Sequence, residues 1–399
     1  MEYFEELLRK PSIFKDESKL DINFIPKKLP HRVKELSLLS QLFLALITNP
    51  NSVSRKILIT GKTGIGKTVT VKYFGKILED ISSKRNLNIK FLHVNCRKER
   101  TSYKVLNKII RLLDNKFPKR GYSSQDLLDF LIDLLNHQNL HILIALDELN
   151  YLINKDDDLI YSLTRVNEGV VSRKQRISLI GIVRDITCLN SLDNSTMSTL
   201  QRNIIKFSTY SKKQIFDILK YRTNISLNEN VLSNKLIEMI SDITFNSGDV
   251  RYGLNLMWRA SKIADSKNLK YVTSDCIRLA NQDLLPFSTS DVLNYMNKQQ
   301  LTFLLAIVKE LSKGDKIEIS LSEVLKRYHI ICENIKLPPR SHSQLWIYLQ
   351  EFKKNNIILI NVISEGIKGR RALIKISDLS LPKLEKNIVK LLNSNGIII

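Results

Sequence analysis

The sequence has few cysteines, no long apolar run and too few acidic residues to balance its basic ones. Its four cysteines, Cys96, Cys188, Cys276 and Cys332, are far apart and form no C-x-x-C pair, which argues against a zinc site or a disulfide framework. No stretch approaches the ~20 apolar residues of a membrane span, and the first residues are too acidic for a signal peptide. We therefore expect a cytoplasmic protein with no membrane association.

Negative charge is the largest deficit. The chain has 62 Lys and Arg against 40 Asp and Glu, a formal net charge of +22. Residues 291–399 account for 17 of these basic residues and 10 of the acidic ones, so both halves of the chain are basic. Such a surplus favours a polyanionic partner, most often nucleic acid, although a lysine-rich proteome would give the same composition. With 399 residues, of which 43% are hydrophobic, the chain is long enough for about two or three globular domains.

Residues 61–68, GKTGIGKT, match the phosphate-binding pattern G-x-x-x-x-G-K-[ST]. An apolar run at 56–60, expected to be a buried strand, precedes them, and a helical stretch at 69–78 follows. Backbone N–H groups and the helix dipole favour phosphate at such a position. A chance glycine turn would not combine all three features. The sequence therefore predicts an ATP/ADP site with Mg²⁺, formed by Gly61, Lys62, Thr63, Gly64, Ile65, Gly66, Lys67, Thr68 and Val69.

A second apolar run, residues 141–148, ends in Asp147 and Glu148, the Walker B pattern. We expect Asp147 to join Thr68 at Mg²⁺ and Glu148 to activate the attacking water. Arg251 follows Gly248 and Asp249 at a helix N-terminus; it is either an ordinary surface residue or a γ-phosphate contact. The catalytic candidates are therefore Lys67, Glu148 and Arg251.

The predicted elements divide the chain into four parts. The spacing of apolar residues predicts a helix over residues 31–48. Aliphatic runs at 56–60, 88–95, 141–148, 177–183 and 204–207 alternate with helical stretches, which predicts an α/β domain with a parallel sheet and helices on both faces. Strand signals then stop and short amphipathic helices follow, as expected for a lid. The predicted parts are a loosely held N-terminal arm (1–25), the α/β domain (26–210), the helical lid (211–288) and a C-terminal domain (289–399).

The C-terminal domain has the element order of a winged helix. Helices at 298–311, from 321, and at 341–354 precede a hairpin of strands at 357–363 and 372–376. The third helix of this motif enters the DNA major groove and the hairpin contacts a neighbouring groove or the backbone, unless the domain binds protein. Basic and polar residues favour DNA. They are Arg340, Ser341, His342, Ser343 and Gln344 at the helix start, and Lys368, Gly369, Arg370 and Arg371 at the hairpin tip.

Together these motifs resemble those of the archaeal origin-recognition and cell-division-control initiators, over residues 26–376. The resemblance implies an AAA+ P-loop ATPase fold with a helical lid and a C-terminal winged helix. Pro30, His31 and Arg32 are similar to the family's adenine-side box, and residues 248–252 to its sensor 2 motif, with Arg251 in the sensor role. It also implies that a helical segment before the Walker B strand, here 97–120, contacts DNA.

The resemblance implies an initiator that binds ATP/ADP with Mg²⁺, binds double-stranded origin DNA, and helps recruit the replicative helicase, with paralogous initiators as further partners. We expect it in the cytoplasm on the nucleoid. The sequence departs from the family at Arg184, where an asparagine is usual, and at Ser195, where an arginine is usual. ATP binding should survive, whereas hydrolysis is left open. The alternatives are a divergent paralogue acting as a DNA-bound regulator, and an ATPase whose winged helix binds protein.

Overall fold

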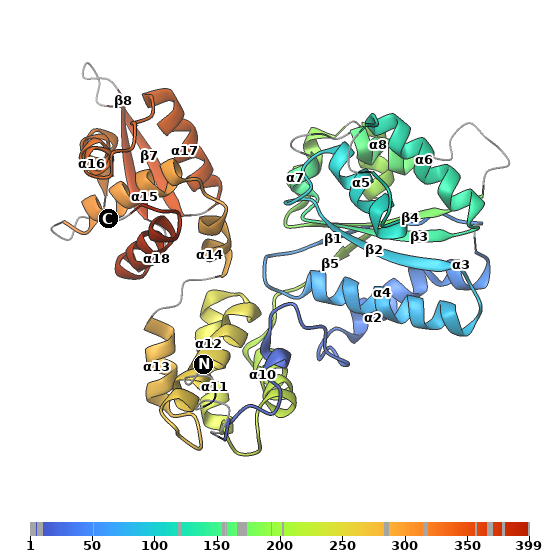
Figure 1. Ribbon diagram of the computed structural model, residues 1–399, viewed down its shortest axis with the longest axis horizontal. Coiled ribbons are helices and arrows are strands. Elements are labelled where there is room, and N and C mark those ends of the chain that lie inside the picture. The colour runs from blue at the N-terminus through green and yellow to red at the C-terminus, as the bar shows by residue number, and fades with distance from the viewer. Residues whose placement is uncertain are drawn as a thin grey trace. The chain divides into compact units, whose positions relative to one another are not determined.

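The computed structural model describes residues 5, 11–50, 52–118, 121–153, 156, 158–165, 174–192, 194–201, 203–282, 287–313, 318–355, 357–364, 370–376 and 380–397. The chain forms two compact units, Met1–Asn255 and Leu256–Ile399, which we describe separately (Figure 1). The boundary between them falls inside one helix, so the domain limits expected at 25, 210 and 288 stay predictions. No helix among the described residues is long and apolar enough to span a bilayer.

The first unit is built on a parallel sheet in the order β2-β3-β4-β1-β5. All five strands lie where the aliphatic runs predicted them. Their bounds are β1 (Lys56–Thr60), β2 (Ile89–Asn95), β3 (His141–Asp147), β4 (Ile177–Val183) and β5 (Ile204–Lys206). Because the strands are parallel and in close register, their carboxyl ends share one edge of the sheet. The predicted α/β fold class is confirmed.

Helices cover both faces of this sheet (Figure 1). One face carries α2 (Val33–Leu42), α3 (Leu44–Thr48) and α4 (Lys67–Lys84), and the other carries α5 (Ser102–Leu113), α6 (Ser124–His137), α7 (Asn150–Ile153), α8 (Asp158–Arg165) and α9 (Asn194–Gln201). Alternate residues of β1 separate the two cores: Ile57 and Ile59 pack with Phe43 and Phe74, while Leu58 packs on the opposite side. β3 and β4 are buried along their whole length, and strands buried on both faces need nearly continuous aliphatic runs, which is why these two strands show no polar alternation.

The N-terminal segment is held more firmly than expected. Ile13 and Leu20 are buried, and the N–H groups of Lys15 and Asp16 both donate to the carbonyl of Ser226 on α10 (Lys212–Ser226). A short 3₁₀ helix, η1 (Glu17–Leu20), packs beside α10. The expectation of a loosely held arm is therefore wrong for residues 11–24. Charged and apolar residues alternate in this segment without strong helix caps, so its few buried side chains gave only a weak signal.

The predicted lid helices are present. α10 packs on α11 (Asn234–Ser247), and α10 begins with a capping box formed by Ser211 and Gln214. α11 ends at Gly248, whose φ of 68° is the left-handed geometry that glycine permits at a helix C-terminus. α12 (Val250–Ser266) starts at once, and α13 (Ser274–Gln282) lies in the second unit.

The second unit contains the predicted winged helix. Its elements are α14 (Phe287–Asn294), α15 (Lys298–Leu311), β6 (Ile319–Ser320), α16 (Leu321–Asn334), α17 (His342–Lys354), β7 (Ile358–Ser364), β8 (Arg370–Ile376) and α18 (Leu381–Ser394). The strands form an antiparallel sheet in the order β6-β8-β7. Phe303, Tyr328 and Phe352 form the centre of its core, and α18, which we did not predict, adds Leu384 and Ile388. This unit therefore has a hydrophobic core of its own.

Candidate functional site

The phosphate loop lies between the end of β1 and the start of α4, as predicted. Gly64 and Gly66 have φ values of 77° and 87°, in the left-handed region that favours glycine. Gly66 is the N-cap of α4 and supplies no side-chain hydrogen bond to the first-turn N–H groups. The helix N-terminus therefore presents backbone donors suited to an anion.

Lys67 lies folded over the loop. Its ammonium group donates to the carbonyls of Gly61 and Lys62, the latter at 2.7 Å, and the residue is only 9% exposed. Burial lowers the pKa of Lys67 to about 8, an effect that the negative charge of Asp147 opposes and the positive charges of Arg184 and Arg251 reinforce. Phosphate oxygens in the loop would replace the two carbonyls as partners and favour the charged ammonium.

Asp147 and Thr68 come together at the end of β3. The Thr68 hydroxyl donates to Asp147 Oδ2 at 2.8 Å, and His93 Nε2 lies 3.1 Å from the same oxygen. Burial raises the pKa of Asp147, but the hydrogen bonds from His93 and Thr68 outweigh it and hold that pKa below its usual value. The carboxylate is therefore ionised and aimed at the position where the sequence predicted Mg²⁺.

These residues fit a magnesium ion in a nucleotide site. Among the described residues no three His, Cys, Asp or Glu side chains gather as a metal cluster. Mg²⁺ at phosphates commonly takes one or two protein ligands and completes its shell with water and phosphate oxygens. Thr68 and Asp147 supply such a pair.

His93 was missed by the sequence analysis. It lies on β2, which is hydrogen-bonded to β3 with Asn95 opposite Asp147 and His93 opposite Ala145. The one available signal was a histidine near the end of an otherwise aliphatic strand. Only the strand order places it beside Asp147.

Glu148 is paired with Arg184. Arg184 Nη2 lies 3.0 Å from Glu148 Oε1, and both side chains are partly exposed. Glu148 also has a φ of 53°, unusual for a residue with a side chain. Arg184 stands where the resemblance led us to expect an asparagine, so this departure lies at the predicted catalytic carboxylate.

The start of α12 lies against the phosphate loop. The Val250 N–H donates to the Gly64 carbonyl at 3.2 Å, and the Asp249 carboxylate packs so tightly on Gly64 that an added Cβ there would lie 2.1 Å from Asp249 Cγ. Arg251 Nη2 pairs with Asp249 Oδ2 at 2.7 Å. The structure thus brings Arg251 close to the loop, while its role at the γ-phosphate stays a prediction.

The proposed adenine-side residues have structural contacts. Arg32 is buried, with Nη2 donating to the Ile65 carbonyl at 2.6 Å and its guanidinium carbon 3.9 Å from the Tyr210 ring centroid. His31 Nε2 lies 2.9 Å from Asp217 Oδ2 on α10. Arg32 therefore holds the backbone of the phosphate loop, and nucleotide contacts by Pro30, His31 and Arg32 stay predictions.

In the segment before β3 that we expect to contact DNA, residues 97–120, only some of the basic side chains are exposed. Arg97 is buried and lies 5.5 Å from the Tyr151 ring, and Arg100 donates to the Arg97 carbonyl. Lys104 and Lys108 on α5 are exposed. Buried Arg97 is not placed for a phosphate contact, whereas Arg100 is exposed like the two lysines; Lys119 and Arg120 lie outside the described residues.

The polar residues at the start of α17 are exposed, as predicted. Ser341 caps the helix by accepting from the Gln344 N–H, and His342, Ser343 and Gln344 are exposed. Arg340 is also exposed, and its N–H donates to the Tyr328 hydroxyl. Leu345, Tyr348, Leu349 and Phe352 fix the opposite face of α17 in the core.

Two large apolar residues of α17, Trp346 and Ile347, are also exposed, at 37% and 53%. At the wing, Lys368 and Gly369 lie outside the described residues. Arg370 and Arg371 begin β8 opposite Ser364 and Ile363. Only their backbone positions are described, so their predicted DNA contacts stay predictions.

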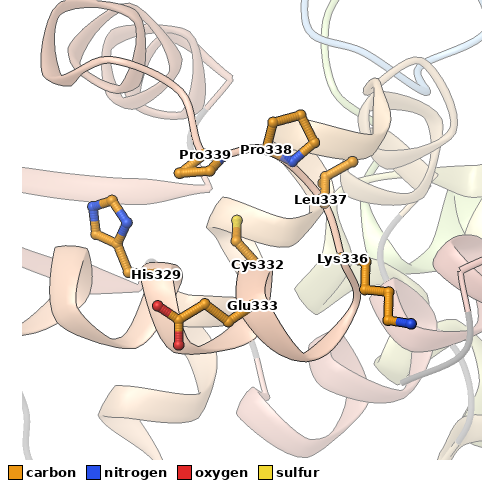
Figure 2. Close-up of a pocket in the computed structure, with 7 residues that line it drawn as sticks. All are labelled: His329, Cys332, Glu333, Lys336, Leu337, Pro338 and Pro339. Atoms are coloured by element: carbon orange, nitrogen blue, oxygen red, sulfur yellow. The ribbon is translucent and has the colours of Figure 1, made fainter.

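The approach to α17 is braced by polar contacts. Gln299 Nε2 donates to the Pro338 carbonyl at 2.6 Å, and the Tyr328 hydroxyl donates to Gln299 Oε1. Figure 2 shows the shallow pocket on this loop, lined by His329, Cys332 and Glu333 of α16 and by residues 336–339. Its lining combines an acid, a lysine and prolines, a set that favours no particular class of ligand. The braced loop fixes where α17 begins.

A P-loop sheet with a Walker B carboxylate, a helical lid and a winged helix defines the AAA+ class of P-loop proteins. Comparison with known families agrees: residues 52–182 match the AAA domain, residues 216–282 the Cdc6 AAA+ ATPase-type lid domain, and residues 291–380 the CDC6 C-terminal winged helix domain.

Similar proteins share nearly the whole chain. The ORC1-type DNA replication protein 2 of Sulfurisphaera tokodaii is 32% identical over 382 residues, covering 94% of this chain and 91% of that protein. Its counterpart in Saccharolobus solfataricus is 30% identical, covering 92% and 90%. The chain belongs to the family of ORC1-type DNA replication proteins of archaea.

Solved structures agree in fold. The structure of Aeropyrum pernix ORC1 in complex with DNA has a TM-score of 0.81 at 24% identity, covering 96% of this chain and 98% of that one. The structure of Cdc6p from Pyrobaculum aerophilum has a TM-score of 0.63 at 28% identity, covering 96% and 100%.

Proposed function

We propose that this protein is an ATP-binding replication initiator that binds double-stranded DNA at an origin and helps recruit the replicative helicase. The observation that carries the nucleotide part is the hydrogen bond between Thr68 Oγ1 and Asp147 Oδ2 at 2.8 Å. It brings the end of the phosphate loop to the Walker B carboxylate, as a site for a nucleotide with Mg²⁺ requires.

In this proposal the backbone N–H groups of residues 61–67 and the Lys67 ammonium hold the phosphates of ATP. Thr68 and Asp147 hold Mg²⁺, which neutralises phosphate charge when bound. In hydrolysis, water attacks the γ-phosphorus, its bond to the β–γ bridging oxygen breaks, and ADP and phosphate leave. Glu148 orients that water and accepts its proton.

The DNA part rests on α17 and on the charge of +22. His342, Ser343 and Gln344 are exposed on a helix whose opposite face is fixed in the core. A similarly folded protein, Aeropyrum pernix ORC1, has been solved in complex with DNA, which supports the same class of partner here. Phosphate contacts by the basic surface would supply affinity, while side chains of α17 would read bases.

The experiment is recovery of sheared host DNA on the purified protein at near-physiological salt, with ATP and with ADP, followed by sequencing. We expect enrichment of a few intergenic sites that is lost when Arg370 and Arg371 are both changed to Glu. Uniform recovery would contradict origin binding. Capture of the replicative helicase on the origin-bound protein tests the second partner, and sites beside paralogous initiator genes would point to those partners.

A second candidate is a DNA-bound regulator that binds ATP but turns it over slowly. The contact between Arg184 and Glu148 favours it, because a paired carboxylate is a poor base for water. Glu148→Gln separates the two functions. A clear loss of ATP turnover supports a working ATPase, whereas a slow rate that does not change supports the regulator.

A further inference from the structure

Arg184 and Glu148 are placed together by the sheet. Glu148 directly follows β3 and Arg184 directly follows β4, and these strands are parallel neighbours with Leu146 opposite Gly181. The strand register therefore fixes the separation of the two backbones. Arg184 Nη2 reaches Glu148 Oε1 at 3.0 Å, with the side chains 35% and 23% exposed.

The backbone of Glu148 is also fixed. Its φ of 53° is held by two hydrogen bonds, from its own N–H to Asp147 Oδ1 at 2.9 Å and from the Leu149 N–H to the Ile182 carbonyl at 3.0 Å. A strained backbone held this way sets the range that the carboxylate can reach. Glu148 therefore cannot leave Arg184 by a movement of its main chain without losing these contacts.

The phosphate end of the site has other cations. Lys67 lies over the loop, and Arg251 lies beside it on α12 in an ion pair with Asp249, so the site has two cations besides Arg184. Arg184 directly follows β4 and pairs with Glu148, one residue after Asp147. Arg184 is thus close to the reaction centre, with its guanidinium engaged by the predicted base.

We infer that Arg184 is a positioning residue that restrains Glu148, so that the protein retains bound ATP instead of cleaving it quickly. The inference rests on the proposed nucleotide site. A guanidinium N–H occupies Glu148 Oε1 and restrains the direction of the carboxylate, whose second oxygen must still be turned to the attacking water. Turning Glu148 to that water competes with its contact to Arg184, which slows hydrolysis without weakening ATP binding.

The test compares four proteins in single-turnover ATP hydrolysis, with ATP affinity measured separately by fluorescence titration. Arg184→Asn removes the restraint, Arg184→Lys keeps the positive charge, and the pair Arg184→Asn with Glu148→Gln removes both partners. Arg85→Asn is the matched control, because it makes the same chemical change at an exposed residue at the far end of α4 from Lys67.

We expect Arg184→Asn to hydrolyse bound ATP about 10-fold faster or more, within the range that a positioned base contributes, at unchanged ATP affinity. The gain should vanish in the double variant, and Arg184→Lys and Arg85→Asn should keep the slow rate. An unchanged or slower rate in Arg184→Asn would overturn the inference. If the wild-type protein still binds ATP, the proposed nucleotide site would remain supported. Failure of the wild-type protein to bind ATP would overturn both.

Discussion

The imidazole of His93 lies 3.1 Å from Asp147 Oδ2, the oxygen that also accepts the Thr68 hydroxyl. Neighbours of this kind orient a metal-binding carboxylate, and their loss commonly costs about 10- to 100-fold in metal affinity. His93 therefore belongs to the site although it lies on a different strand from both Walker motifs.

We predict that His93→Ala weakens Mg²⁺-dependent ATP binding by about 10-fold. Titration of the protein with ATP, with and without Mg²⁺, measures the effect, and binding without Mg²⁺ should change little. His137→Ala, at an exposed position on α6, is the control. Equal weakening with and without Mg²⁺ would show that His93 supports the fold instead of Asp147.

Gly64→Ala should impair nucleotide binding and stability together. The new Cβ would lie 2.1 Å from Asp249 Cγ, at a residue whose φ is 77°. The backbone strain alone costs about 1–2 kcal/mol, and the contact adds to it by displacing the first turn of α12. Urea unfolding and ATP titration measure the two effects.

Gly396→Ala is the control that separates backbone strain from the contact with Asp249. Its φ is 79°, close to that of Gly64, but no atom lies within 4 Å of an added Cβ. We expect it to show the strain cost and normal ATP binding. If both variants bind ATP equally well, the packing of Asp249 on Gly64 has no role in the site.

Arg340→Glu should weaken binding to duplex DNA and lower its salt dependence. The side chain is exposed, while the Arg340 N–H keeps its bond to Tyr328, so α17 should start normally. Removing one phosphate contact lowers the slope of log affinity against log salt by about 0.9. Lys390→Glu, exposed on α18, makes the same change of charge as a control. Equal losses in both variants would indicate a non-specific charge effect.

His141 predicts a specific pH dependence of stability. The residue is 1% exposed, and burial lowers its pKa to about 4. Above the ordinary pKa of about 6.5 both the folded and the unfolded forms are neutral, so stability is fully present. As the pH falls from about 6.5 to 4, only the unfolded state gains the proton, and about 3 kcal/mol of stability is lost.

Urea unfolding between pH 7 and pH 4 tests this prediction. His141→Gln should flatten the decrease in the free energy of unfolding over that interval, because glutamine does not titrate. His329→Gln, which makes the same change at an exposed position on α16, is the control. A wild-type profile that is flat from pH 6.5 to 4 would contradict a depressed pKa of His141.

The sequence predicted most helices and strands, because these are determined by residues close together along the chain. The strands at 56–60 and 177–183 were predicted with their exact bounds, because a short continuous aliphatic run between polar residues is typical of a buried strand. The expected helix from 31 to 48 is instead two helices that meet at Phe43, whose side chain is buried in the core. Leu39, Phe43 and Leu46 are all buried, as one continuous helix would bury them, so the apolar spacing carries no signal for the break at Phe43.

Contacts across the sheet were not predictable in the same way. The pairs His93–Asp147 and Arg184–Glu148 depend on the order β2-β3-β4, which places the ends of three distant segments side by side. The sequence could show that Arg184 departs from the family, but not where its guanidinium points. Helix α18 did carry a signal, since Leu384, Ile388 and Leu392 repeat at intervals of four and are buried.

The N-terminal segment limits how far the chain can be shortened from its start. Buried Arg222 on α10 donates to the Asp21 carbonyl at 2.8 Å, Tyr73 on α4 donates to the Lys27 carbonyl, and Arg32 holds the phosphate loop. Residues 21–32 thus contact the lid helix α10, the helix α4 and the phosphate loop. A truncated chain starting at residue 52, where the AAA domain match begins, would leave Arg222 buried without these carbonyl partners. We therefore expect the smallest fragment that folds with an intact phosphate loop to begin some forty residues before that match, near residue 11.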